Sequence, residues 1–204
     1  MKQKSIGFFG GSFDPVHCGH LNLAISLLEK HKLDHVLFCP TYISPFKAEK
    51  NSHVSPHHRK EMVKRAIAPL PHFSLLDYEI NNEKPSFTID TIKHLKNLYI
   101  EESQDIQIRL LLGDDMLEGL PRWKDIEDLL KLAPPLVASR LSSPKWPDGL
   151  SSTAFATLQT GTTQIPILDI SSTEIRERLK KRLYCGHLIP FQVLDYIHQN
   201  QLYE

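Results

Sequence analysis

Cysteines, net charge and long apolar runs are scarce in this sequence, and each shortage excludes a class of protein. The three cysteines form no Cys-x-x-Cys pair and no even set for disulfides, which favours a reducing cytoplasm. The 24 basic and 24 acidic residues balance, so neither a nucleic acid nor an anionic membrane is the expected partner. Because no apolar stretch approaches the ~20 residues of a membrane span, we expect a soluble, cytoplasmic protein.

Two familiar nucleotide-binding patterns are also missing, namely Gly-x-Gly-x-x-Gly and the Gly-Lys-Ser/Thr of a Walker loop. In their place, the apolar run Ile6–Phe9 leads into Gly10-Gly11-Ser12, and a helical pattern begins near His20. Glycines let the backbone approach a ligand, and the first turn of a helix offers free N–H groups, a combination that suits phosphate. His17 and His20 bring two imidazoles to the same helix start.

The run from Gly10 to His20, Gly-Gly-Ser-Phe-Asp-Pro-Val-His-Cys-Gly-His, resembles the signature of nucleotidyltransferases with a His-x-Gly-His motif. Its form is similar to that of the bacterial nicotinate-nucleotide adenylyltransferases, and the resemblance extends from residue 6 to residue 203. It implies that His17, His20 and Arg176 are catalytic. No metal site is expected at the histidines, because no second pair of ligands lies at a structural-zinc spacing. The residues assigned to ATP by this resemblance are Gly10, Gly11, Ser12, Phe13, His17, His20, Asp115, Ser171, Ser172, Thr173 and Arg176.

Strands that alternate with helices predict an α/β protein with a Rossmann-like, doubly wound parallel sheet. We expect one domain over residues 1–204, with a helical C-terminal part from about 170 to 204. Val36–Cys39 is predicted to be a short buried strand that Pro40 stops. In such a sheet, ligands bind at the carboxyl ends of the strands.

The last third of the sequence predicts a surface excursion, a final strand and a second anion site. Residues 141–161 are rich in Ser, Thr, Pro and Gly and predict a variable surface loop. Ile165–Asp169 predicts the last strand. Ser171 and Glu174 have the spacing of a capping box, which fixes a helix start whose amides and hydroxyls can bind an anion. Arg176 lies in the first turns of that helix, where its guanidinium can bind phosphate oxygens.

The segment Ser86-Phe87-Thr88 is similar to the Ser-Tyr-Thr element of the same family. Thr88 is predicted to cap a helix, and free amides at that helix start prefer a carboxylate to a carboxamide, because the NH₂ of an amide cannot accept from them. The resemblance implies that this segment binds the carboxylate of nicotinate. It also maps the family's Gly-x-Asp element onto Gly113 and Asp115, so that Asp114 occupies the variable position. The resemblance implies that the carboxylate of Asp115 accepts hydrogen bonds from ribose hydroxyls.

By the same resemblance, Trp123 stacks on the pyridine ring, for which a flat indole is suited. Lys47 is expected to contact substrate phosphate. Three residues depart from the family's pattern, because it usually has histidine at Phe46, tyrosine at Phe87 and an aromatic residue at Lys124.

The resemblance implies adenylyl transfer from ATP to nicotinate mononucleotide, with Mg²⁺ on the ATP phosphates. Two alternatives stay open at this point. One is an adenylyltransferase for another acceptor, either nicotinamide mononucleotide or phosphopantetheine, and the other is a non-catalytic nucleotide-binding regulator. A homo-oligomer is compatible with the sequence, which does not fix the oligomeric state.

Overall fold

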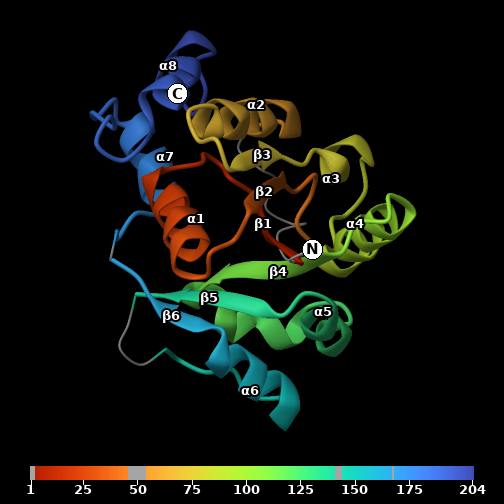
Figure 1. Ribbon diagram of the computed structural model, residues 1–204. Coiled ribbons are helices and arrows are strands. Elements are labelled where there is room, and N and C mark those ends of the chain that lie inside the picture. The colour runs from red at the N-terminus through yellow and green to blue at the C-terminus, as the bar shows by residue number, and fades with distance from the viewer. Residues whose placement is uncertain (1–2, 46–53, 141–143, 167) are drawn as a thin grey trace. The chain divides into compact units, whose positions relative to one another are not determined.

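The computed structural model describes residues 3–45, 54–140, 144–166 and 168–204. Within these ranges, six strands form one sheet in the order β3-β2-β1-β4-β5-β6 (Figure 1). β4 pairs in parallel with β1 and with β5, and β5 pairs in parallel with β6. This order confirms the predicted Rossmann-like, doubly wound sheet. The strands are β1 (Lys4–Gly11), β2 (His35–Pro40), β3 (Phe73–Leu75), β4 (Ile106–Gly113), β5 (Pro135–Ser139) and β6 (Thr162–Gln164).

The described chain divides into two compact units. Unit 1 combines the described residues of 1–9, 23–37 and 87–167, and unit 2 combines those of 10–22, 38–86 and 168–204. β1, β2 and helix α1 (Cys18–Lys30) each contribute residues to both units. β2 ends at Pro40, which confirms the second predicted strand.

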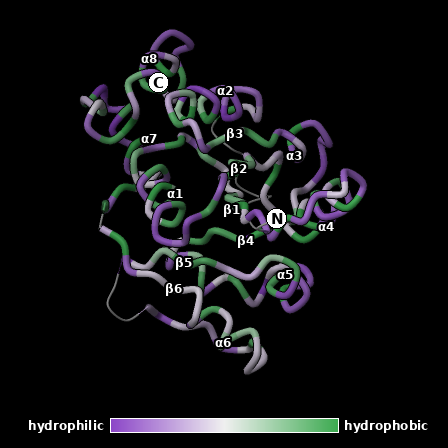
Figure 2. Tube along the Cα trace, in the orientation of Figure 1, coloured by the Kyte–Doolittle hydropathy of each residue, from purple (hydrophilic) through white to green (hydrophobic). Residues whose placement is uncertain are grey.

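Unit 1 is built on β4 and β5, whose apolar side chains are buried and form the hydrophobic stretches seen along these strands in Figure 2. Helix α4 (Thr88–Glu101) packs against β4 and against α5 (Ile126–Leu132), while α6 (Ser152–Thr160) packs against β5 and α5. A 3-10 helix, η1 (Asp114–Arg122), follows β4 directly. The residues directly after β4 and β5 include the charged side chains of Asp114, Asp115 and Arg140.

Two predictions for unit 1 were wrong. The predicted surface excursion contains α6, whose N-cap Ser151 accepts from the amide of Ala154 (3.2 Å). Its buried face is small, with Ala154 and Leu158 as its buried residues, so the periodicity was too weak to reveal a helix. The last strand in the described ranges is β6, and the described residues of the predicted strand Ile165–Asp169 belong to no strand, while residue 167 lies outside the described ranges. β6 is short and polar and is held by backbone pairing to β5, so no apolar run marks it.

Unit 2 contains helices α2 (Pro56–Ile67), α3 (Tyr78–Asn81), α7 (Ser172–Lys180) and α8 (Phe191–Gln199), together with the first residues of α1. α2 packs against β3, α3 and α8. Ser55 caps α2, since its hydroxyl accepts from the amide of His58 (3.3 Å) and Pro56 occupies the first helical position. None of the helices in the described ranges is both long and apolar enough to cross a membrane.

Candidate functional site

The Gly10–His20 loop comprises the last two residues of β1, the turn that follows them and the first three residues of α1. Its glycines allow close packing of aromatic rings. A Cβ at Gly11 would lie 3.1 Å from the ring of Phe13, and a Cβ at Gly19 would lie 3.0 Å from Nδ1 of His17. Both separations are shorter than ordinary van der Waals contact. The glycines of the motif therefore let Phe13 and His17 fold back onto the loop.

The two histidines of the motif lie together in unit 2, as the sequence predicts. Their rings stack with centroids 3.7 Å apart, and the backbone N–H of His17 donates to Nδ1 of His20 (3.2 Å). Because Nδ1 of His20 accepts, the proton of its neutral ring lies on Nε2, which can donate to a ligand. Phe13 also contacts His20 edge-on, with ring centroids 5.1 Å apart.

His17 is a neutral donor at physiological pH. Its side chain is buried, with 5% of the residue exposed, and this burial lowers its pKa from 6.5 to about 4. Its Nδ1 is buried and has no hydrogen-bond partner among the described residues. A buried polar nitrogen without a partner is costly, so a bound water, ion or ligand group is the expected partner of this atom.

The start of α7 contacts the Gly10–His20 loop, so unit 2 brings the histidine motif and the predicted second anion site together. Ser171 caps the helix by accepting from the amide of Glu174 (3.1 Å), which confirms the predicted helix start. Ser172 donates its hydroxyl to the carbonyl of Pro15 (2.9 Å). Arg176 donates from one nitrogen to the carbonyl of Asp14 (2.6 Å) and from another to the hydroxyl of Thr173 (3.1 Å).

Arg59 of α2 was not among the predicted site residues. Its side chain is fully buried and donates to the carbonyls of Ser12 and Tyr42, each at 2.8 Å. Burial lowers the pKa of Arg59, while the nearby charge of Asp14 acts in the opposite direction. Arg59 thus ties the Gly10–His20 loop to the segment after β2.

Unit 2 contains two of the residues predicted to bind nicotinate mononucleotide, Ser86 and Lys47, and the structure describes Ser86. The hydroxyl of Ser86 accepts from the amide of Tyr42 (3.0 Å), and the amide of Ser86 donates to the carbonyl of Ile43 (2.9 Å). Ser86 is therefore a buried structural link in this unit. Phe46 and Lys47 lie outside the described residues.

In unit 1, the prediction that Thr88 caps its helix was wrong. α4 begins at Thr88, and the N-cap position is occupied by Phe87, whose side chain cannot cap. The first amides of α4 thus have no side-chain cap, and an acceptor has to come from elsewhere. Lys124 binds Asp90 of the first turn (2.9 Å), and its ammonium lies 4.8 Å from the ring centre of Phe87. Two of the three departures from the family's pattern therefore contact each other.

The carboxyl end of β4 carries two adjacent carboxylates with different surroundings. Asp114 is buried and accepts from the amide (2.8 Å) and Nε (3.1 Å) of Arg140 and from the hydroxyl of Ser139 (3.3 Å). The side chain of Asp115 is 65% exposed and lies 3.5 Å from Arg140. A Cβ at Gly113 would collide with the carboxylate of Asp115. Asp114, the variable position, is the anchor of this turn and leaves Asp115 accessible to a ligand.

Trp123 follows η1 and is half-buried, with its amide bonded to the carbonyl of Leu120 (3.0 Å). It is absent from the fully buried core of unit 1, so part of its indole is accessible to solvent and to a flat ligand. For the metal, the described side chains form no group of three or more His, Cys, Asp or Glu residues that could hold an ion. Mg²⁺, which often binds through substrate phosphates and keeps several waters, does not require such a cage.

The sequence was compared with known proteins. A cytidylyltransferase-like family model matches residues 8–178. A nicotinate-nucleotide adenylyltransferase of Bacillus subtilis is 37% identical over 99% of this chain and 100% of its own length. A probable nicotinate-nucleotide adenylyltransferase of Methylacidiphilum infernorum is 36% identical over 97% of this chain and 91% of its own.

Among solved structures, the nicotinic acid mononucleotide adenylyltransferase of Plasmodium falciparum, complexed with NaAD, superimposes with a TM-score of 0.73. The match covers 98% of this chain and 97% of that chain at 22% identity. At this level of identity, the likeness supports the fold.

Proposed function

Because the chain belongs to the cytidylyltransferase-like family and, within it, to the nicotinate-nucleotide adenylyltransferases, we propose that it transfers the adenylyl group of ATP to nicotinate mononucleotide. The products are nicotinate adenine dinucleotide and pyrophosphate. The observation that carries this proposal is the pair of helix starts in unit 2, with the stacked histidines at α1 and Arg176 at α7. Both ends offer donors to an anion, and His17 keeps one buried nitrogen unpaired.

In this reaction, the phosphate of nicotinate mononucleotide attacks the α-phosphorus of ATP. The new P–O bond forms as the bond to the bridging oxygen of the leaving pyrophosphate breaks. No general base is required, because a phosphate monoester with a second pKa of roughly 6 is largely ionised at pH 7. Catalysis therefore consists of alignment and of stabilising negative charge on the leaving group, and alignment alone can contribute about 7 kcal/mol.

The ATP phosphates are assigned to the Gly10–His20 loop and the first turn of α7. His17 and His20 donate neutral N–H groups, and Arg176 exchanges its backbone acceptor for phosphate oxygens. Mg²⁺, when bound to the ATP phosphates, neutralises part of their charge. Losing one such donor is expected to raise the barrier by about 3 kcal/mol.

The acceptor is assigned to residues of the α4 start and of the turns after β4. The uncapped amides near Thr88 bind the nicotinate carboxylate, with Lys124 adding a positive charge beside that turn. Trp123 stacks on the pyridine ring, and Asp115 accepts from ribose hydroxyls. Ser86 and Phe87 shape the same segment, and Lys47 contacts substrate phosphate.

The test is pyrophosphate release from ATP and Mg²⁺ with nicotinate mononucleotide, nicotinamide mononucleotide or phosphopantetheine at equal concentrations. Strong preference for the nicotinate form is the expected result. Preference for another acceptor would retain the phosphate chemistry of unit 2 and overturn the assignment at α4. Release with none of the three would identify a nucleotide-binding protein without transferase activity.

A further inference from the structure

The Gly10–His20 loop is held by residues that follow position 168, and three of their contacts go to or from its backbone. Ser172 and Arg176 donate to the carbonyls of Pro15 and Asp14, and the carbonyl of Leu188 accepts from the amide of Cys18 (2.9 Å). A fourth contact differs, because it goes to a side chain. The hydroxyl of Tyr203 donates to Oδ1 of Asp14 at 2.6 Å.

Both partners of this fourth contact are buried. Asp14 is 7% exposed and Tyr203 is 8% exposed. Tyr203 lies in the turn after α8, where its φ of +67° falls in the left-handed region that residues other than glycine rarely adopt. Such a conformation persists where surrounding packing and hydrogen bonds impose it, and these positions cluster near functional sites.

The charges around the contact keep the tyrosine protonated. Burial and the negative charge of Asp14 raise the pKa of Tyr203 well above its usual range. The hydroxyl is therefore a donor at every pH at which the protein works. Arg59, fully buried beside this carboxylate, holds the neighbouring carbonyl of Ser12 (2.8 Å). Asp14 is thus a buried acceptor with fixed neighbours, and a short hydrogen bond of this kind is strong.

We propose that Tyr203 is a positioning residue for the nucleotide loop. Its hydroxyl fixes the carboxylate of Asp14, and through it the Asp14 carbonyl to which Arg176 donates. Without that hydroxyl, one oxygen of a buried carboxylate loses its donor, so the Asp14 side chain has to reorient or admit water. The backbone at Asp14 then moves, and with it the starting position of the Arg176 guanidinium. This inference rests on the proposed function, which assigns that guanidinium to ATP phosphate.

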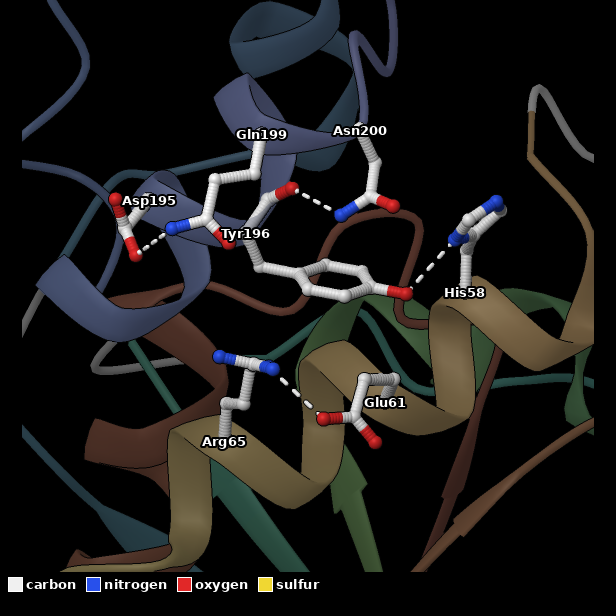
Figure 3. A network of polar contacts seen from close by, with 7 residues as sticks. All are labelled: His58, Glu61, Arg65, Asp195, Tyr196, Gln199 and Asn200. Carbon is white, nitrogen blue, oxygen red and sulfur yellow. Dashed lines mark hydrogen bonds and ion pairs between the residues drawn. The ribbon is translucent and has the colours of Figure 1, made fainter.

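The matched test compares Tyr203→Phe with Tyr196→Phe in the full chain. Tyr196 is also 8% exposed, and its hydroxyl bonds to Nδ1 of His58 (2.8 Å) in the network between α8 and α2 (Figure 3). Each change removes one buried hydroxyl from the same part of unit 2. The Tyr203 hydroxyl donates to Asp14, whereas the Tyr196 hydroxyl bonds to His58. Tyr203→Phe is expected to lower kcat/KM for ATP by about tenfold or more, with KM for nicotinate mononucleotide unchanged. Tyr196→Phe should leave both values within about twofold of wild type.

Hydrogen exchange without substrates gives a second readout that does not need activity. Amides of residues 12–20 should exchange faster in Tyr203→Phe than in Tyr196→Phe at equal thermal stability. ATP alone should also stabilise Tyr203→Phe less than it stabilises wild type. Equal exchange and equal kinetics in the two variants would overturn the positioning role. If wild type makes no dinucleotide while the exchange difference is present, the proposed function fails and the control of the loop by Tyr203 stands.

A double-mutant cycle tests the route through Asp14. If the hydroxyl acts through that carboxylate, Tyr203→Phe should have little further effect on kcat/KM for ATP in an Asp14→Ala background. Full additivity of the two changes would show that Tyr203 acts on the loop by another path, and would overturn the proposal.

Discussion

Of the three helix starts that the sequence marks for ligands, those of α7 and α4 are built in different ways. The start of α7 is capped by Ser171, and its Ser172 and Arg176 donate to backbone carbonyls of the Gly10–His20 loop. The start of α4 has Phe87 at the N-cap, without a side-chain cap, and the contact to its first turn is the exposed pair of Lys124 and Asp90. A highly charged triphosphate needs donors that are already in place, whereas open amides suit a ligand that brings its own acceptor.

The largest loss of activity in this comparison is expected from a substitution at the start of α7. Arg176→Ala removes a donor to phosphate and releases the Asp14 carbonyl, so kcat should fall by about a hundredfold. The control is Arg178→Ala on the same helix, because Arg178 donates to the carbonyl of Tyr184. It should leave kcat within about twofold of wild type in steady-state assays of dinucleotide formation. Equal losses in the two variants would mean that Arg176 acts only through the stability of the helix.

The next effect concerns the buried histidine beside α7. Burial in the folded protein lowers the pKa of His17 from 6.5 to about 4. Between pH 6.5 and pH 4, the unfolded chain therefore binds a proton at His17 and the folded protein does not. Stability is therefore unaffected by His17 above pH 6.5 and falls below it, by about 3 kcal/mol in total near pH 4.

The measurement is denaturant unfolding of wild type and His17→Asn between pH 7.5 and 4.5. The free energy of unfolding of wild type relative to the variant should decrease as the pH falls. A pH-independent difference would place the His17 ring in solvent.

A smaller effect, on the free energy of unfolding, distinguishes the capped start of α7 from the uncapped start of α4. Ser171→Ala should lower the free energy of unfolding by about 1 kcal/mol, because it leaves the Glu174 amide without its acceptor. Thr88→Ala should change it by less than about 0.5 kcal/mol, since Thr88 is the first helical residue and does not cap. Thermal or denaturant unfolding of both variants compares the sites directly. A loss of equal size at Thr88 would restore the original prediction of a threonine cap.

The smallest effect is expected at Lys124. Its ion pair with Asp90 is about half exposed, so Lys124→Ala should cost roughly 0.5 kcal/mol of stability in low salt. High salt should reduce this cost, which denaturant unfolding at two ionic strengths can measure. A salt-independent cost would indicate instead that the contact with the Phe87 ring dominates.

Much of the fold and of the phosphate site could be predicted from local signals. Pro40 at the end of β2 and the Ser171–Glu174 spacing each act within a few residues, and the structure agrees with both. Gly10 and Gly11, predicted to follow the first strand, are its last two residues. The helix α6 and the strand β6 could not be predicted, because few of their side chains are buried and backbone pairing defines the strand. Thr88 was misplaced by one residue, which is the ordinary uncertainty of a helix boundary.

Arg59 and Tyr203 show a different limit of prediction from the sequence. Each acts on the Gly10–His20 loop from a position distant in sequence, 47 residues from Ser12 in one case and 189 from Asp14 in the other. An arginine in a helix and a tyrosine in a turn usually indicate exposed residues, and nothing local indicates that these two are buried. Their partners appear only once the fold is known.

The most direct test of the account is the rate of nicotinate adenine dinucleotide formation by His20→Ala beside wild type, with thermal unfolding measured on both. His20 contacts Phe13 and His17, and removing its ring should lower kcat at least about a hundredfold while the unfolding temperature changes little. Turnover close to wild type would contradict the assignment of the stacked histidines to the transferred and leaving phosphates.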